Sequence, residues 1–140
     1  MRPRPLRVRF PQPGRPIAQP AFASNKSRLQ NRQRWQKQLP LRAVATNQSG
    51  VGRGFYTDAD LMVIHQKMLS SIKALGGQVD KVFYCPHLPD DQCCCRKPGI
   101  GLFEQIADYY QLDLRGIIAI GDSLRDIKAA LKVGCQPILV

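Results

Sequence analysis

Four side chains between Cys85 and Cys95 are of the types that bind zinc in proteins. Cys85 and His87 are separated by one residue, and Cys93 and Cys95 are separated in the same way. Three thiolates and one imidazole are donors that a closed tetrahedral zinc site uses, so the spacing predicts a structural zinc site. Cys94 is an alternative ligand. Residues one position apart point the same way from an extended loop, however, which favours Cys93 and Cys95.

The same stretch has two other interpretations. One is a redox-labile surface loop without a metal, and the other is a disulfide. Disulfides are the weaker alternative, because five cysteines cannot all pair and no signal peptide is recognisable. Arg96 and Lys97 follow the last cysteine of the cluster directly. A metal would hold this loop so that it presents two cations, which indicates an anionic ligand such as a phosphate.

From residue 43 onward, short apolar runs alternate with longer amphipathic segments. Strands that alternate with helices in this way predict an α/β domain with a parallel sheet. Ligands of such domains bind beyond the carboxyl ends of the strands. Strands are expected over 43–45, 81–84, 117–120 and 137–140, and helices over 58–75, 102–110 and 123–133.

The first expected helix has the clearest boundary signals. Thr57 and Asp60 are spaced as an N-terminal capping box, and Gly76 marks the end of the helix. His65 lies in this helix and is interpreted as an ordinary exposed or partly buried histidine, not as a ligand. Apolar residues at helical spacing are expected to face the core, and they are Leu61, Ile64, Met68, Ile72 and Leu75.

Polar side chains follow three of the expected strands. Thr46 and Asn47 can donate hydrogen bonds to phosphoryl oxygens, and Lys97 can neutralise charge that develops there. Asp122 can supply a carboxylate oxygen to Mg²⁺. Together these residues predict a site for a phosphate and a divalent cation.

Each of these signals also has a purely structural interpretation. The polar segment 46–50 is expected to be a turn, and the Arg96–Lys97 pair is compatible with a solvated surface. Asp126 lies three residues after Ser123, which is the spacing of a second capping box and at least as good an explanation as a metal role.

The net charge of +11 is confined to the first 42 residues. They hold nine Arg, two Lys and seven of the eleven Pro but no Asp or Glu, whereas residues 43–140 carry equal numbers of both signs. Frequent proline and few apolar residues prevent a buried core, so residues 1–42 are predicted to be a disordered basic arm. The chain then divides into this arm and one domain, 43–140, without an apolar run that could span a bilayer.

Three interpretations of the basic arm compete. Clustered Arg without acidic residues is typical of a tail that binds nucleic acid. The same composition suits an organelle transit segment. The third interpretation is an out-of-frame readout upstream of a real gene, and the abrupt change of composition near Arg42 favours it.

Four motifs together resemble the haloacid dehalogenase (HAD) superfamily. The resemblance is to the branch of heptose-bisphosphate phosphatases and histidinol-phosphatases, and it covers about residues 43–140. It implies a Rossmann-like parallel sheet with helices on both faces and a Mg²⁺-dependent phosphatase with a zinc-bearing loop. The motifs are VATNQSG at 44–50, YCPH at 84–87, CCCRKP at 93–98 and GDS at 121–123.

The resemblance also implies roles for individual residues. Thr46 and Lys97 would be catalytic positions that hold the phosphoryl group, and Asp122 would bind Mg²⁺. The implied substrate-binding residues are Thr46, Asn47, Gln48, Ser49, Arg96 and Lys97, and the implied zinc ligands are Cys85, His87, Cys93 and Cys95.

Members of this family open with a strand that ends in Asp-x-Asp, where one carboxylate attacks phosphorus and the other is the general acid. Residues 1–42 contain no Asp or Glu, so the sheet is expected to lack its first strand, nucleophile and general acid. We therefore expect an incomplete or frame-disrupted phosphatase of lipopolysaccharide precursor synthesis, inactive as it stands. The alternatives are a histidinol-phosphatase and a non-enzymatic zinc protein whose arm binds nucleic acid.

The expected partner is a phosphorylated small molecule, with Mg²⁺ and Zn²⁺ as cofactors. A monomer in the cytoplasm, without membrane association, is expected. Nucleic acid binding through residues 1–42 is the weaker alternative.

Overall fold

The computed structural model describes residues 41–140 of the chain. The expectations for the basic arm therefore lie outside the described residues, apart from its last two positions. Within the described part no helix is long and apolar enough to cross a membrane. The elements in chain order are β1 (Ala43–Asn47), α2 (Ser49–Gly52), α3 (Asp58–Ala74), β2 (Lys81–Cys85), the 3-10 helix η1 (Pro89–Asp91), α4 (Gly101–Tyr110), β3 (Ile118–Gly121), α5 (Leu124–Lys132) and β4 (Gln136–Leu139).

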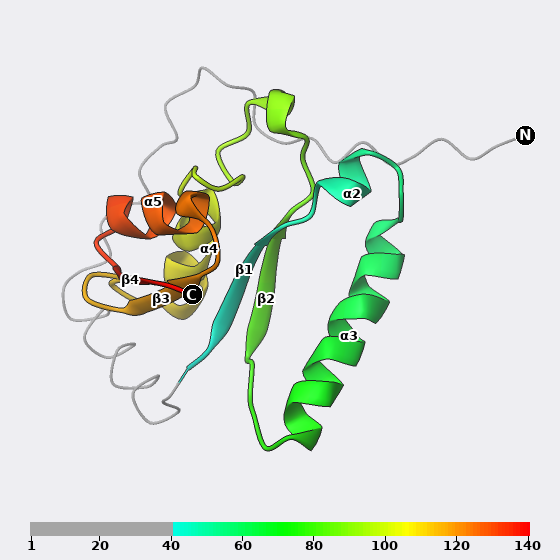
Figure 1. The fold of residues 1–140 in the computed structure, drawn as a ribbon, viewed down its shortest axis with the longest axis horizontal. Helices are drawn as coiled ribbons and strands as arrows, with labels where there is room; N and C mark the ends of the chain where they lie inside the picture. Colours follow the sequence, from blue (N-terminus) through cyan, green and yellow to red (C-terminus); the bar gives the residue numbers. More distant parts are fainter. Residues whose placement is uncertain (1–40) are drawn as a thin grey trace, which may run out of the picture.

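The strands form two parallel pairs. Strand β1 pairs with β2, with Ala43 opposite Lys81, and β3 pairs with β4, with Ile118 opposite Gln136. Figure 1 shows the two pairs as separate parts of the fold, and no hydrogen-bonded ladder among residues 41–140 joins them. The predicted α/β class with parallel strands is confirmed. The lack of a ladder between the two pairs agrees with the expectation that the sheet is missing its first strand.

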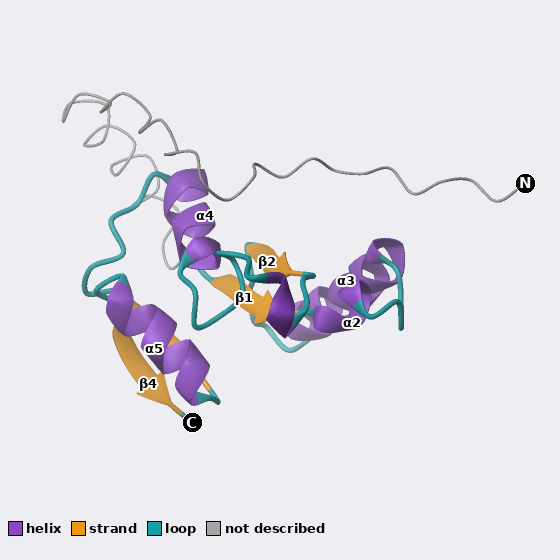
Figure 2. Cartoon of the chain, turned by 90° about the horizontal axis from the view of Figure 1, so that it is seen from above, coloured by secondary structure: helices purple, strands orange, loops and turns teal. Residues whose placement is uncertain are grey.

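Helices cover both faces of the β1–β2 pair (Figures 1 and 2). Side chains alternate along a strand, so Phe83 and Cys85 of β2 point to one face and Tyr84 to the other. Phe83 and Cys85 are buried in the core with Leu102 of α4. On the opposite face the Tyr84 hydroxyl donates to Asp58 of α3 at 3.0 Å. The β1–β2 pair is thus a layer between α4 and α3.

Helix α5 packs on the β3–β4 pair, and its Ala129 and Ala130 are buried. A Cβ atom at Gly121 would lie 2.4 Å from Cβ of Asp126, so only glycine permits this close approach of strand and helix. Ile118 and Ile120 point to the other face of the strand and are exposed. The predicted strand over 117–120 is present as Ile118–Gly121, and no described element covers this face of it.

The N-terminal signals of α3 are confirmed, and its inward face agrees with the prediction in part. Thr57 and Asp60 form the predicted capping box. Leu61 is buried as predicted and Met68 and Ile72 are partly buried, whereas Ile64 and Leu75 are exposed. His65 is partly buried, which its interpretation allowed, and its ring lies 5.7 Å from the ring of Tyr84. The apolar spacing was compatible with two neighbouring faces, and packing against β2 selected the one that contains His65.

The segment predicted as a polar turn also differs in detail. Thr46 and Asn47 extend β1, and Ser49 begins the short helix α2. The amide of Gln48 donates to the carbonyl oxygen of Cys85 at 2.7 Å, and the amide of Gly52 donates to that of Pro86 at 3.0 Å. The carboxyl ends of β1 and β2 are thereby held side by side.

Candidate phosphate-binding pocket and cysteine cluster

A pocket of ≈ 330 Å³ lies beyond the carboxyl ends of β1 and β3. This is the place where parallel α/β sheets bind ligands, because side chains from separate strand ends converge there. Three residues predicted from different segments of the sequence are brought together in it. The lining residues are Thr46, Asn47, Lys97, Asp122, Ser123, Arg125 and Asp126.

Lys97 is held in this pocket by three residues. Its ammonium group lies 2.6 Å from Oδ1 of Asp126, and both side chains are largely buried, with 12% and 13% of their surface exposed. The ammonium group also donates to the carbonyl oxygen of Ala45 at 2.6 Å. The Asn47 side chain accepts from the Lys97 amide at 3.0 Å and donates to the Lys97 carbonyl oxygen at 3.1 Å. Asn47 therefore fixes the backbone of Lys97, a contact that the sequence did not indicate.

Asp126 combines the predicted capping role with an unpredicted ion pair. Its Oδ2 accepts from the Ser123 hydroxyl at 2.6 Å and from the Ser123 amide at 3.1 Å, while Oδ1 faces Lys97. Burial acts to raise the pKa of Asp126, but the hydrogen bonds from Lys97 and Ser123 outweigh burial and lower it. Asp126 is therefore a bound anion with both oxygens engaged, which makes it a poor nucleophile or general base.

Thr46 is oriented by a chain of two hydrogen bonds. The Tyr56 hydroxyl donates to Oε1 of Gln48 at 2.9 Å, and Nε2 of Gln48 donates to Oγ1 of Thr46 at 3.1 Å. Because Thr46 accepts this bond, its own hydroxyl proton is available for a ligand. A Cβ atom at Gly50 would lie 2.4 Å from the Tyr56 ring, so glycine at this position lets the ring approach. Tyr56 was not singled out in the sequence, since only the fold places it beside Gln48.

Some predicted site residues lie outside the pocket lining. Gln48 donates a hydrogen bond to the Thr46 hydroxyl oxygen but does not line the pocket. Ser49 is the first residue of α2 and does not line it either. Arg96 donates to the carbonyl oxygen of His87 at 3.2 Å. Arg125, in contrast, lines the pocket but was not predicted, because a cation early in an amphipathic helix is usually a solvated surface residue.

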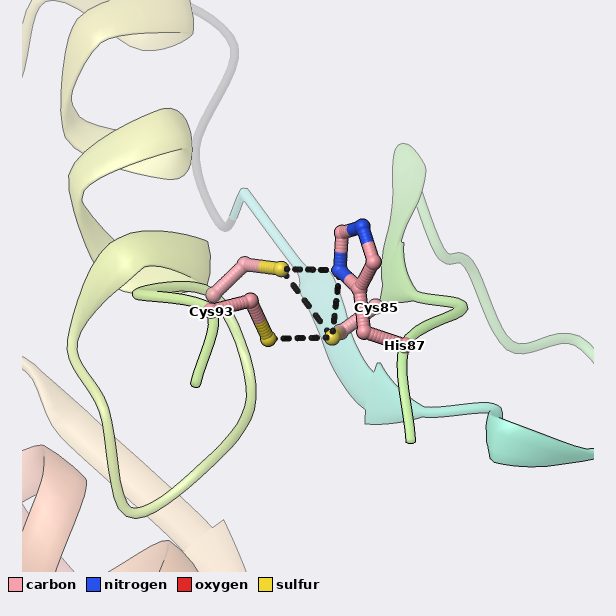
Figure 3. A group of neighbouring side chains, drawn as sticks. Cys85, His87 and Cys93 are labelled. Carbon is pink, nitrogen blue, oxygen red and sulfur yellow. Dashed lines mark hydrogen bonds between the residues drawn. The ribbon is translucent and has the colours of Figure 1, made fainter. Parts of the chain in front are cut away.

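The four predicted zinc ligands converge at the carboxyl end of β2. Their ligand atoms all lie within 4.8 Å of one another, whereas Cys94 is exposed. Figure 3 shows the side chains of Cys85, His87 and Cys93 pointing toward one another. Sγ of Cys85 lies 3.6 Å from Sγ of Cys93 and 3.0 Å from Sγ of Cys95. Cys93 and Cys95, which the sequence spacing favoured over Cys94, are therefore the two that lie beside Cys85 and His87.

The donor set fits a tetrahedral metal ion. Sulfur ligands around a tetrahedral zinc lie about 3.8 Å apart, given a Zn–S distance of about 2.3 Å. The Cys85–Cys93 separation of 3.6 Å is close to that value, whereas the Cys85–Cys95 separation of 3.0 Å is shorter and would have to widen around an ion. Burial raises the pKa of the Cys85 and Cys95 thiols, so without a metal both stay protonated at neutral pH. A bound cation would reverse this preference, because it stabilises the thiolate.

The cysteine cluster and the pocket belong to one continuous loop. The loop leaves β2 at Cys85, returns at Cys95 and runs directly into Lys97. The amide of Gly101, at the start of α4, donates to the carbonyl oxygen of Cys94 at 3.0 Å. The position of the cluster thus determines where the Lys97 side chain enters the pocket.

The sequence of this chain is similar to sequences of known proteins. A model of the HAD-hydrolase-like family matches residues 94–140. The chain is 53% identical over 97 residues to D-glycero-beta-D-manno-heptose-1,7-bisphosphate 7-phosphatase of Bordetella bronchiseptica, which covers 69% of this chain and 54% of that protein. It is 50% identical over 98 residues to the protein of the same name from Pseudomonas aeruginosa, covering 70% and 55%. The chain spans about half the length of these curated relatives.

Solved structures show the same similarity. The D,D-heptose 1,7-bisphosphate phosphatase of B. bronchiseptica, complexed with magnesium and phosphate, matches with a TM-score of 0.69 and 48% identity, over 79% of this chain and 62% of that one. A proposed HAD-like phosphatase from Mesorhizobium loti matches with a TM-score of 0.64 and 28% identity, over 69% and 50%. In sequence and in fold, the part of the chain that the structure describes is therefore similar to about half the length of the heptose-1,7-bisphosphate 7-phosphatases of the HAD-like family.

Proposed function

We propose that residues 41–140 form the phosphate-binding and Mg²⁺-binding part of a phosphatase that acts on a sugar bisphosphate. The observation that carries this proposal is the convergence of Thr46, Lys97 and Asp122 in one pocket, although they come from three distant segments. The similarity to a structure complexed with magnesium and phosphate supports the same ligands here. The names of the relatives support a heptose 1,7-bisphosphate as the substrate and its 7-phosphate as the group released.

The residues of the pocket have separate tasks in this proposal. The Thr46 hydroxyl donates to a phosphoryl oxygen, and Lys97 supplies a further hydrogen-bond donor. Asp122 is the hard oxygen ligand for Mg²⁺, which when bound neutralises charge on the phosphoryl group. Asn47 and Asp126 keep Lys97 in place. These groups bind and orient a phosphate but do not attack phosphorus.

Asp58 and Asp126 are the first candidates among the carboxylates of residues 43–140 for a replacement nucleophile. Asp126 is engaged by Lys97 and Ser123. Asp58 accepts a hydrogen bond from Tyr84 and does not line the pocket. Residues 1–42 contain no Asp or Glu. We therefore infer that the chain binds phosphate esters without hydrolysing them at an enzymatic rate.

We further propose that Cys85, His87, Cys93 and Cys95 bind one Zn²⁺. Support comes from the donor types, the 4.8 Å limit on their separations and the burial of two thiols. The role of the ion would be structural, because four protein ligands close a tetrahedral site. It would hold the loop that carries Lys97 into the pocket.

A fusion protein tests the phosphatase proposal. Residues 1–42 are replaced by a strand that ends in Asp-x-Asp and the helix that follows it in a heptose-bisphosphate phosphatase. Mg²⁺-dependent phosphate release from heptose 1,7-bisphosphate should then appear, and it should disappear when Asp122→Ala removes the metal ligand. A fusion that folds, binds Mg²⁺ and releases no phosphate would contradict the proposal.

A further inference from the structure

The pocket contains four charged side chains, two of each sign. They are Lys97, Arg125, Asp122 and Asp126. Their charges cancel, so the ligand that this pocket recognises depends on which charges already have partners inside the protein. An ion pair that is satisfied internally attracts a ligand far less than an unpaired charge does.

Lys97 has little capacity left for a ligand. An ammonium group has three N–H donors. One faces Asp126 and another donates to the carbonyl oxygen of Ala45, each at 2.6 Å. One donor remains, and the charge of Lys97 is already offset by Asp126. Lys97 can therefore give one oriented hydrogen bond, which suits the phosphoryl group at the buried end of the pocket.

Arg125 is in the opposite situation. It is exposed in the first turn of α5, and within residues 41–140 neither an ion pair nor a hydrogen bond engages its guanidinium group. Asp122 lines the same pocket without pairing with it. Helix stability does not explain a cation at this end, since the helix dipole favours anions there. Its planar guanidinium can bind a phosphate with two parallel hydrogen bonds.

We propose that Arg125 binds a second phosphate group of the substrate and so makes the pocket prefer sugars with two phosphates to sugars with one. This rests on the proposed function and assigns a specificity role within it. Lys97 is largely buried and Arg125 is exposed, so the two cations lie at different depths of the pocket. The phosphate at the buried end meets Thr46 and Lys97, and a phosphate at the other end of a short sugar reaches Arg125.

Binding measurements on the full 140-residue chain test this assignment. Fructose 1,6-bisphosphate and fructose 6-phosphate are titrated in the presence of Mg²⁺ by calorimetry. We expect the bisphosphate to bind about tenfold more tightly, which is typical of one added charge-assisted contact. Arg125→Ala should abolish this ratio and leave the monophosphate Kd within about twofold of its original value. Arg125→Lys should keep part of the ratio, because it retains the charge without the planar fork.

Lys128→Ala is the matched control. Lys128 is an exposed cation of the same helix that does not line the pocket, so its removal should leave the ratio unchanged. If Lys128→Ala lowers the ratio as much as Arg125→Ala, the preference reflects general electrostatic attraction and the assignment is wrong. If Arg125→Ala weakens both sugars equally or neither, the assignment is also wrong.

The unmodified chain separates this inference from the proposed function. Equal binding of the two sugars to it would overturn the role of Arg125 while leaving the phosphate pocket intact. If neither sugar binds, both the pocket and the role of Arg125 are refuted. Circular dichroism of each variant checks that the fold is retained.

Discussion

The ion pair between Lys97 and Asp126 is the strongest electrostatic contact of the candidate site. Both side chains are largely buried, whereas the Arg115–Asp113 pair has 81% and 56% of its side-chain surface exposed. Opposite charges near the surface gain little because water and salt screen them, and screening weakens with burial. The two pairs therefore provide a natural comparison within one chain.

We predict that Asp126→Asn lowers the free energy of unfolding by about 1–2 kcal/mol at pH 7, because it leaves Lys97 largely buried without a counter-ion. The folded-state pKa of Asp126 is below its ordinary value of 3.8. The contribution of the pair is therefore fully present above pH 3.8 and is lost as the pH falls through the lower folded value. Urea unfolding at pH 7 and at low pH measures both effects. Asp113→Asn should change stability little, and an equal loss there would argue against burial as the cause.

The cysteine cluster gives a second prediction at the residue scale. Metal analysis of the purified chain should find about one Zn²⁺ per molecule, and Cys94→Ser should leave this value unchanged. Cys95→Ser should release the metal, because its sulfur lies inside the cluster, 3.0 Å from that of Cys85. Loss of zinc in Cys94→Ser alone would show that the ligand set is wrong.

Proton release accompanies zinc binding if the thiols are protonated beforehand. Burial raises the pKa of the Cys85 and Cys95 thiols, so both must lose a proton when the metal binds. At pH 7 we expect release of about two to three protons per Zn²⁺. Calorimetry in buffers of different ionisation enthalpy counts them. Binding without proton release would mean that these cysteines are not the ligands.

At the scale of elements, α3 depends on its N-terminal cap. The Thr57 amide donates to Oδ2 of Asp60 at 2.8 Å, and the Asp60 amide donates to the Thr57 hydroxyl oxygen at 3.1 Å. We predict that Thr57→Ala lowers Tm by about 3–6 °C, because a lost cap leaves unpaired amides in the first turn. Ser70→Ala, at an exposed position in the middle of α3, should leave Tm unchanged or raise it slightly. Equal effects of the two substitutions on Tm would contradict a capping role.

The β3–β4 element shows why an apolar strand pattern does not by itself predict burial. Ile118, Ile120 and Ile138 lie on the face opposite α5 and are exposed within the described part of the chain. Ala119, on the other face, packs against the core. Apolar residues on both faces of a strand are compatible with burial of either face. Which face is buried depends on the elements that pack against it.

For the whole molecule, the central prediction is binding without turnover. The pocket offers donors and a Mg²⁺ ligand, whereas positioning without a nucleophile leaves only uncatalysed attack by water. We expect the unmodified chain to bind fructose 1,6-bisphosphate in the presence of Mg²⁺ and to release no phosphate above the buffer rate. Lys97→Ala should weaken this binding, because it removes one hydrogen-bond donor to the phosphoryl group. Turnover at an ordinary enzymatic rate would show that a carboxylate of this chain acts as the nucleophile, and Asp58 would be the first to test.

Several local features of this protein follow from short spacings in the sequence. The alternation of strands and helices, the capping boxes at Thr57 and Ser123, and the preference for Cys93 and Cys95 over Cys94 all follow from short spacings. Such spacings fix backbone geometry within one or two turns, independently of distant contacts. The placing of Thr46 and Asp122 at strand ends belongs to the same class, since parallel strands bring their carboxyl ends to one edge.

Which of these residues contact one another depends on long-range packing. Only packing pairs Lys97 with Asp126, links Tyr56 through Gln48 to Thr46 and brings Arg125 to the pocket without a partner. These contacts join residues that are distant in the sequence, so short-range sequence patterns do not predict them. The inward face of α3 is of the same kind, because its apolar residues suit two adjacent faces and contact with β2 selects one. Long-range packing therefore places the predicted phosphate ligands in one pocket. Among the described residues of this pocket, Lys97 is paired with Asp126 and Arg125 has no partner.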